Sequence, residues 1–181
     1  MSKISVKKGD KLKIYVDGAS RGNPGPAASA FILVHNDNLI HNECVFIGTA
    51  TNNTAEYRAI INALKFAERY SRGHIQVFSD SNLAIQQINK KWKINYPHLS
   101  KLCSEVYKLR EKYEKVEFFH VGRNNPYIQK CDTLCNERLD AEGFKNWTIK
   151  NFCSLNFYLR FLIYGNLYPQ FTQNFEFGKR V

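Results

Sequence analysis

The stretch Tyr15-Val16-Asp17-Gly18-Ala19-Ser20-Arg21-Gly22-Asn23-Pro24-Gly25-Pro26-Ala27 joins a predicted strand to a turn-rich segment. Leu12, Ile14 and Val16 stand at alternate positions, which is typical of a half-buried strand. Gly and Pro residues between 20 and 26 exclude regular structure there. The strand is therefore predicted to close at Asp17-Gly18, with an acidic side chain at its end.

Two further apolar runs follow, over 27–35 and 39–48, and Asn36-Asp37-Asn38 between them is a hairpin signal. The first 48 residues thus predict a three-strand antiparallel meander. The remaining predicted elements are, in order, a helix over 54–70, a strand over 75–79, a helix over 81–89, a helix over 98–113, a strand over 116–120 and, after a polar loop over 123–129, a helix over 130–140. This order predicts an α/β domain in which helices lie on the faces of a mixed sheet.

The composition limits the partners of this domain. Of 181 residues, 26 are basic and 16 acidic, so the net charge is +10 and favours a polyanion, either nucleic acid or an anionic membrane surface. A solvated basic face is the alternative. The chain has no apolar run long enough to span a membrane and no apolar segment of a signal peptide, so we expect an intracellular, cytoplasmic protein that does not enter membranes.

The five cysteines also indicate an intracellular protein, because an odd number predicts reduced thiols instead of a disulfide framework. Cys131 and Cys135 are four residues apart and suit one face of a helix. No second Cys or His pair stands at ligand spacing, so no zinc site is expected.

The last 41 residues form a separate segment in this interpretation, with one domain over 1–140 and a C-terminal extension over 141–181. The extension contains 11 of the 25 aromatic residues of the chain. Its aromatic side chains are expected either to pack on the domain or to form a contact surface for a protein partner.

Four acidic residues stand where predicted elements begin or end, and each has a purely structural explanation. Asp17 before Gly18 suits a turn, and Glu56, three residues after Asn53, has the spacing of a capping box. Asp80 suits the N-cap of the next helix, and Asp132 in the first turn of the last helix complements the helix dipole.

Taken together, the four carboxylates predict a metal site. If Asp17 and Asp80 close adjacent parallel strands, both lie at the sheet edge where ligands of α/β proteins gather, and two helices can bring Glu56 and Asp132 there. Several neighbouring carboxylates do not all stay ionised and unpaired, and divalent cations resolve this conflict. Oxygen ligands without His or Cys favour Mg²⁺ or Mn²⁺, and a metal pair in a basic protein suggests phosphodiester cleavage.

The segments that carry these residues resemble the four motifs of type 1 ribonuclease H, in the order of that family. They are Tyr15–Ala27 quoted above, Thr51-Asn52-Asn53-Thr54-Ala55-Glu56, Phe78-Ser79-Asp80-Ser81-Asn82 and Cys131-Asp132-Thr133-Leu134-Cys135-Asn136. The resemblance covers about residues 9–140 and implies the ribonuclease H-like fold, with a five-stranded mixed sheet flanked by helices.

The resemblance also implies an endoribonuclease that hydrolyses the RNA strand of RNA–DNA hybrids with two metal ions and leaves 5′-phosphate and 3′-hydroxyl ends. Asp17, Glu56, Asp80 and Asp132 match the metal-binding carboxylates of the family. Asp17 is expected to bridge both Mg²⁺ ions, for which Mn²⁺ is a substitute, and Glu56 to approach the ribose 2′-hydroxyl.

Other motif positions are implied to touch the hybrid. They are Asn23, Asn52 and Asn53 for the minor groove or backbone, Thr51 for a DNA phosphate, and Asn82, which replaces the usual Gln. The loop before Asp132 lacks the His of many bacterial members, so the chain resembles the subgroup with a basic residue there. Arg123 is the candidate for that role and His120 a weaker one, while Ile128 departs from the subgroup, which usually has Asn there.

The chain also resembles members without the extra basic helix that grips hybrid. Lys90-Lys91-Trp92-Lys93 is a candidate replacement, in which Lys91 binds phosphate and Trp92 lies against a DNA sugar. A solvated helix end is the structural alternative. We expect a monomer that cuts hybrid. A hybrid-binding module or retroelement-derived domain of a larger complex, and a nuclease of this fold acting on DNA, are the alternatives.

Overall fold

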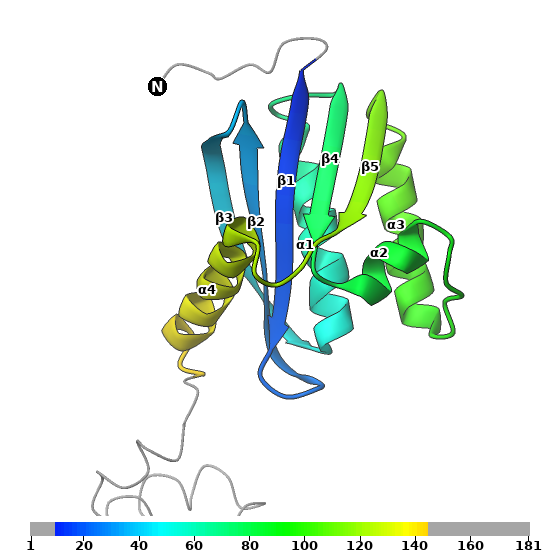
Figure 1. Cartoon of the computed structure of the whole chain (residues 1–181). Coiled ribbons are helices and arrows are strands. Elements are labelled where there is room, and N and C mark those ends of the chain that lie inside the picture. Colours follow the sequence, from blue (N-terminus) through cyan, green and yellow to red (C-terminus); the bar gives the residue numbers. More distant parts are fainter. Residues whose placement is uncertain (1–9, 145–181) are drawn as a thin grey trace, which may run out of the picture. The chain divides into compact units, whose positions relative to one another are not determined.

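A computed structural model describes residues 10–144 of the chain, and the proposed extension over 141–181 lies almost entirely outside this range. These residues form five strands and four helices, which are labelled in Figure 1. They are β1 (Lys11–Ser20), β2 (Gly25–His35), β3 (Asn38–Ala50), α1 (Asn52–Ala67), β4 (His74–Ser79), α2 (Asn82–Ile88), α3 (Pro97–Arg110), β5 (Lys115–His120) and α4 (Pro126–Ala141). None of the described helices is long and apolar enough to cross a membrane.

The five strands form one mixed sheet in the order β3-β2-β1-β4-β5. β1 and β2, and β2 and β3, pair antiparallel, so the predicted meander is confirmed. Asn36 and Asp37 turn the hairpin with positive φ angles of 49° and 59°, which these residue types tolerate better than most. β1 pairs parallel with β4, and β4 with β5. β1 is therefore the central strand, with an antiparallel neighbour on one side and a parallel one on the other.

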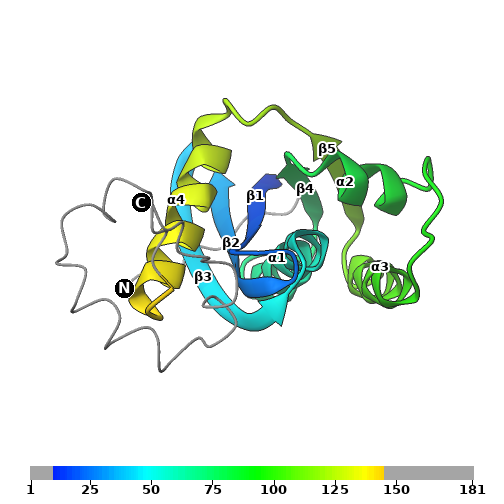
Figure 2. The same cartoon turned by 90° about the horizontal axis from the view of Figure 1, so that it is seen from below.

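Helices cover both faces of the sheet (Figure 2), with α4 on one side and α1 and α3 on the other. The alternation of β1 explains this, because Leu12, Ile14 and Val16 are buried in the cluster with α1 and α3. Tyr15 points to the opposite face and packs in the cluster with Cys131 and Cys135 of α4. The predicted helix-flanked mixed sheet is thus confirmed.

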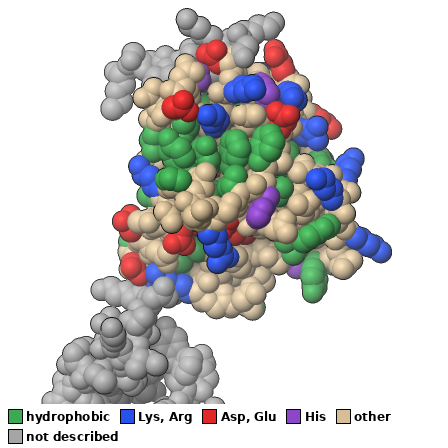
Figure 3. Space-filling model, in the orientation of Figure 1, with side chains coloured by type: hydrophobic (Ala, Val, Ile, Leu, Met, Phe, Trp, Pro, Cys, Tyr) green, Lys and Arg blue, Asp and Glu red, His purple; other side chains and the backbone are tan. Residues whose placement is uncertain are grey.

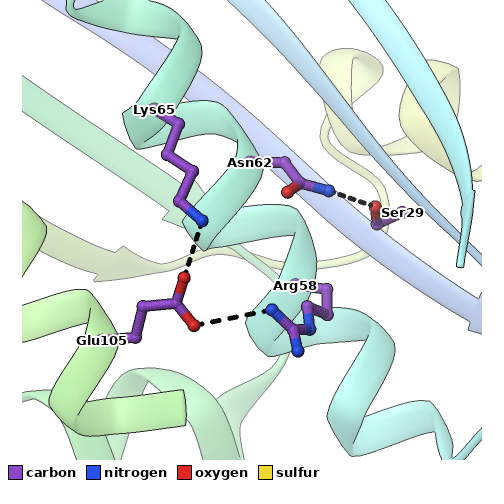
Figure 4. Close-up of polar contacts among 5 residues, drawn as sticks. All are labelled: Ser29, Arg58, Asn62, Lys65 and Glu105. Atoms are coloured by element: carbon purple, nitrogen blue, oxygen red, sulfur yellow. Dashed lines mark hydrogen bonds and ion pairs between the residues drawn. The ribbon is translucent and has the colours of Figure 1, made fainter.

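Polar contacts hold α1 in place between the sheet and α3 (Figure 4). Asn62 donates a hydrogen bond to the buried hydroxyl of Ser29 on β2 over 3.0 Å. On the other side of α1, Lys65 lies 2.7 Å and Arg58 3.5 Å from the carboxylate of Glu105 on α3. α1 is therefore fixed from two directions, and Glu56, which it carries, is fixed with it.

Several predicted element bounds were wrong in ways that matter for the carboxylates. α1 begins at Asn52, so Glu56 lies in its second turn and is not part of a capping box. α4 begins at Pro126, four residues earlier than predicted, so 126–129 are helical and Asp132 also lies in a second turn, where no dipole argument applies. β1 continues past Asp17 to Ser20, and the N-cap of α2 is Ser81, not Asp80.

The end of the domain also lies slightly beyond the predicted boundary after residue 140. α4 ends at Ala141, and the ring of Phe144 stacks on Phe46 of β3 with centroids 5.7 Å apart. The described part of the chain therefore includes the first residues assigned to the extension, and the rest of that prediction concerns residues outside the described range.

Candidate active site

Asp17 lies on β1, where the parallel pairing with β4 stops. The last pair in register is Val16 with Ser79, so the next residues are Asp17, still on β1, and Asp80, directly after the end of β4. Figure 1 shows that both strands run in the same direction and that β1 continues beyond the end of β4. The predicted juxtaposition of Asp17 and Asp80 is present, although β1 itself continues as a partner of β2.

Glu56 reaches this edge because Gly18 lets α1 approach β1 closely. A Cβ on Gly18 would lie 2.3 Å from the backbone carbon of Ala55 and 2.3 Å from the backbone nitrogen of Glu56. No side chain fits in that space, so the strand and helix backbones touch here. Sequence reasoning did not identify this role of Gly18, although a glycine directly after an acidic strand residue was a signal for it.

Three of the four predicted carboxylates meet at this edge. One carboxylate oxygen from each of Asp17, Glu56 and Asp80 lies within 4.8 Å of the others. Asp17 and Glu56 are 7% and 5% exposed. Within the described residues, the buried oxygens Oε2 of Glu56 and Oδ1 of Asp80 have no hydrogen-bond partner. Buried acceptors without donors are costly, and a cation is the partner that would satisfy them.

Asp132 does not belong to this compact group. It lies on the exposed surface of α4. Its charge nevertheless acts on the group, since it contributes to raising the pKa of Asp17. The described structure therefore brings three carboxylates together and leaves the fourth nearby on a separate helix.

The electrostatics of the group follow from burial and like charge. Burial, and then the charges of Asp80 and Asp132, raise the pKa of Asp17 from 3.8 to about 7. Burial, and then the charges of Asp17 and Asp80, raise the pKa of Glu56 well above its ordinary 4.5. A proton or a cation is therefore bound more tightly here than at an exposed carboxylate.

The raised pKa of Asp17 predicts a pH-dependent cost in stability. A carboxyl group whose pKa is higher in the folded than in the unfolded chain stabilises the fold below the unfolded value, and this stabilisation is lost as the pH rises through about 7. Asp17→Asn removes the charge, so without metal its melting temperature at pH 8 should exceed that of the wild type by about 5 °C or more. At pH 5, which lies closer to the unfolded value of 3.8, the difference should be smaller, and it should vanish only below that value.

Thermal denaturation in chelator at both pH values measures this difference. Asp37→Asn is the matched control, because Asp37 is 88% exposed in the hairpin and its substitution should give no gain at pH 8. A melting temperature of Asp17→Asn at or below that of the wild type at pH 8 would contradict the prediction.

Two basic side chains converge on Asp80. Nε of Arg123 donates to Oδ2 of Asp80 over 3.0 Å, although the Arg123 side chain is 89% exposed. Nε2 of His120 lies 3.2 Å from the backbone carbonyl oxygen of Asp80. Both candidates for the basic role are thus close to the site, and only Arg123 contacts a carboxylate.

Four of the residues proposed to touch the hybrid lie at or near the start of α1: Asn23, Thr51, Asn52 and Asn53. Oδ1 of Asn23 accepts a hydrogen bond from the backbone N–H of Asn52 over 3.1 Å. Thr51 is the N-cap, and its hydroxyl accepts from the N–H of Thr54 over 3.2 Å. These contacts fix the helix start, and the half-buried Asn53 follows directly. These residues therefore lie at the start of the helix that carries Glu56.

Asn82, Lys91 and Trp92 lie at the two ends of α2. Asn82 is exposed and accepts from Gln86 over 3.1 Å. Lys91 is exposed and Trp92 is 49% exposed, beyond the end of the helix. Lys91 and Trp92 line a pocket of about 470 Å³, together with Lys90, Lys93 and residues of α3 such as Tyr107. The connection over 89–96 contains no helix, as the resemblance implied.

Comparison with known proteins gives a consistent result. Residues 15–137 match the family model described as "Reverse transcriptase-like". Over 138 residues the chain is 37% identical to ribonuclease HI of Halobacterium salinarum, which covers 76% of this chain and 68% of that protein. A bifunctional protein of Mycobacterium tuberculosis is 35% identical over 134 residues, but the chain spans only 36% of its length.

Solved structures agree with this assignment. The crystal structure of RNase H1 from H. salinarum has a TM-score of 0.69 and 37% identity, and the match covers 72% of this chain and 98% of that one. LC11-RNase H1, solved in complex with an RNA/DNA hybrid, has a TM-score of 0.67 and 30% identity, with coverage of 72% and 98%. With its ribonuclease H fold and its motifs in family order, the chain belongs to the type 1 ribonuclease H family of nucleases.

Proposed function

We propose that the chain is a metal-dependent endoribonuclease that cuts the RNA strand of RNA–DNA hybrids and leaves 5′-phosphate and 3′-hydroxyl ends. The observation that carries the proposal is the buried group of Asp17, Glu56 and Asp80, two of whose oxygens have no partner among the described residues. A relative solved with hybrid bound, at 30% identity, supports the choice of substrate.

The donor set fits the metal that the family implies. It consists of carboxylate oxygens without His or Cys, which suits Mg²⁺ and, as a substitute, Mn²⁺. We propose that Asp17, Glu56, Asp80 and Asp132 hold two such ions. When bound, a metal pair supplies an activated water and stabilises the leaving 3′-oxygen.

The residues of the chain itself orient the substrate in this proposal. Glu56 approaches the 2′-hydroxyl of the ribose beside the cut, the group that distinguishes RNA from DNA. Asn23, Asn52, Asn53 and Asn82 contact the hybrid, and Thr51 binds a DNA phosphate. Arg123 assists at Asp80, because its exposed guanidinium already donates to that carboxylate and is free to move with the products.

Basic surface away from the carboxylates is proposed to hold the duplex. Lys91 would bind phosphate and Trp92 would lie against a DNA sugar, at the pocket between α2 and α3. Figure 3 shows Lys and Arg side chains at several places on one face, around an apolar centre. Phosphate contacts of this kind release counterions, so binding should weaken steeply with salt. Since one chain supplies all four carboxylates, we propose a monomer. Four free thiols among the described residues fit the cytoplasm.

The decisive test incubates the full chain with a hybrid labelled on its RNA strand. We expect internal cuts in the RNA with Mg²⁺ or Mn²⁺ and intact hybrid with chelator, and mapping of the ends should give 5′-phosphates. Single-stranded RNA and double-stranded DNA of the same sequence are the controls and should remain intact. Hybrid left uncut in the presence of either metal would refute the proposed activity and leave a binding module of a larger complex as the explanation.

A further inference from the structure

The short loop between β1 and β2 is tied to three separate elements. Directly before the loop, the hydroxyl of Ser20, the last residue of β1, donates to the carbonyl oxygen of Ala50, at the end of β3, over 2.7 Å. Asn23 accepts from the N–H of Asn52 at the start of α1. The third contact is made by Arg21, which reaches across to α4. A loop of a few residues is thereby fixed against a sheet edge and two helices.

The contact of Arg21 with α4 is specific and largely buried. Nη1 of Arg21 lies 2.7 Å from Oδ1 of Asp140, and the Arg21 side chain is 12% exposed. Nη2 donates to the backbone carbonyl oxygen of Asn136 over 3.2 Å. One guanidinium nitrogen is thus in ion-pair contact with Asp140 and another donates to Asn136 one turn earlier, which a Lys ammonium does not reproduce, while Nε and Nη1 have no hydrogen-bond partner among the described residues. The cation also lies in the C-terminal part of α4, where the helix dipole favours positive charge.

The two partners joined by Arg21 both carry proposed functional residues. The loop carries Asn23, and α4 carries Asp132, one turn before Asn136. We propose that Arg21 is a positioning residue for hybrid binding: it holds the loop against α4, so that Asn23 and Asp132 keep a fixed separation across the substrate. This inference rests on the proposed function.

A direct contact of Arg21 with a phosphate is the competing explanation, and the geometry opposes it. The guanidinium is mostly buried and already faces a carboxylate and a carbonyl oxygen. An arginine that bound phosphate from this position would first have to leave both partners. The two explanations differ in the role of Asp140, the partner of Arg21 on α4, whose side chain is 51% exposed. The positioning role needs Asp140, whereas a direct phosphate contact does not.

Kinetics on labelled hybrid separate these roles. For Arg21→Ala we expect KM to rise about tenfold with kcat within about threefold of the wild type, because a misplaced binding loop weakens substrate positioning. Asp140→Asn should raise KM in the same direction but less, since the bond to the Asn136 carbonyl remains. Arg21→Lys should be intermediate, and the exchanged pair R21E/D140R should recover part of the loss.

Hydrogen exchange tests the tether without substrate. In Arg21→Ala, the amides of residues 21, 22, 23 and 25 should exchange faster, including that of residue 21, which in the wild type donates to the carbonyl oxygen of Pro26 over 2.8 Å. If exchange is faster in Arg21→Ala but the wild-type protein cuts no hybrid, the role of Arg21 in fixing the loop is supported and the proposed function is refuted. Unchanged exchange would overturn the proposal.

Two further results would also overturn it. The first is a combination of two measurements: Asp140→Asn has the KM of the wild type, and hybrid binding by Arg21→Ala depends less on salt, by about one released counterion. This combination is the pattern of a direct phosphate contact. The other is a lower melting temperature of Arg21→Ala with an unchanged KM, since this would make the contact purely structural.

Discussion

Asp80→Asn should reduce cleavage of hybrid by about a thousandfold while leaving hybrid affinity nearly unchanged. Asp80 is the member of the carboxylate group that has one buried oxygen without a partner and another that accepts from Arg123. Asn has the same shape but carries no charge, so the fold should persist while the proposed metal site loses a ligand. The variant lacks the negative charge of the Asp80 carboxylate, which the proposed metal ions need as a ligand.

Single-turnover cleavage with Mg²⁺ measures the rate, and fluorescence anisotropy of labelled hybrid in chelator measures affinity. Asp37→Asn again serves as the control, because it removes an exposed carboxylate of the hairpin turn that is not part of the carboxylate group, and it should leave both quantities unchanged. A wild-type rate in Asp80→Asn would remove Asp80 from the site. A parallel loss of affinity and rate would indicate that Asp80 supports the binding surface instead.

Gly18→Ala should destabilise the domain by about 3 kcal/mol and lower activity by about a hundredfold or more. The added Cβ would lie 2.3 Å from backbone atoms of Ala55 and Glu56, and backbone has no rotamer that gives way. α1 would have to move away from β1, which would carry Glu56 away from Asp17. Stability and activity are therefore expected to fall together.

Urea denaturation and hybrid cleavage test this expectation, with Gly73→Ala as the matched control. A Cβ on Gly73 would approach nothing closer than the Ser71 hydroxyl at 3.4 Å, so that variant should stay within about 0.5 kcal/mol of the wild type. A Gly18→Ala chain with wild-type stability and activity would contradict the close backbone contact described here.

The sequence was sufficient for the sheet, because its signals are local. Asn36-Asp37 specified a hairpin, and the alternation before Asp17 specified which face of β1 is buried. The placement of Asp17 beside Asp80 was predicted from the rule that parallel strands end at a common edge, and it holds although β1 continues past Asp17 to Ser20. The fold and the pairing of these two carboxylates were therefore predictable from the amino-acid sequence alone.

The helix starts were less predictable, since several residues compete as caps. Thr51 and Asn53 are both good N-caps, and the structure uses Thr51. Asn125-Pro126 was an equally clear start signal for α4, but the polar run over 123–129 was interpreted as a loop. These errors placed Glu56 and Asp132 one turn too early in their helices and made capping explanations look reasonable.

Contacts between distant segments could not be predicted from sequence at all. Arg21 and Asp140 are 119 positions apart by their numbering, and nothing in either neighbourhood indicates the other. The close approach at Gly18 is of the same kind, because it depends on how α1 packs on β1. Such features are set by tertiary packing, which local patterns do not encode.

The central position of β1 has a consequence for how the chain folds. Asp17, Glu56 and Asp80 come from segments separated by 39 and 24 positions, and they meet only when β1 has acquired both its parallel neighbour and its helix. Contacts of such sequence separation form late, since loop closure opposes them. The isolated β1–β2–β3 meander, the most local part of the sheet, would contain only one of these carboxylates. Metal-dependent stabilisation is therefore a reporter of the assembled β1, α1 and β4, because no form in which these three elements are apart can present the whole group.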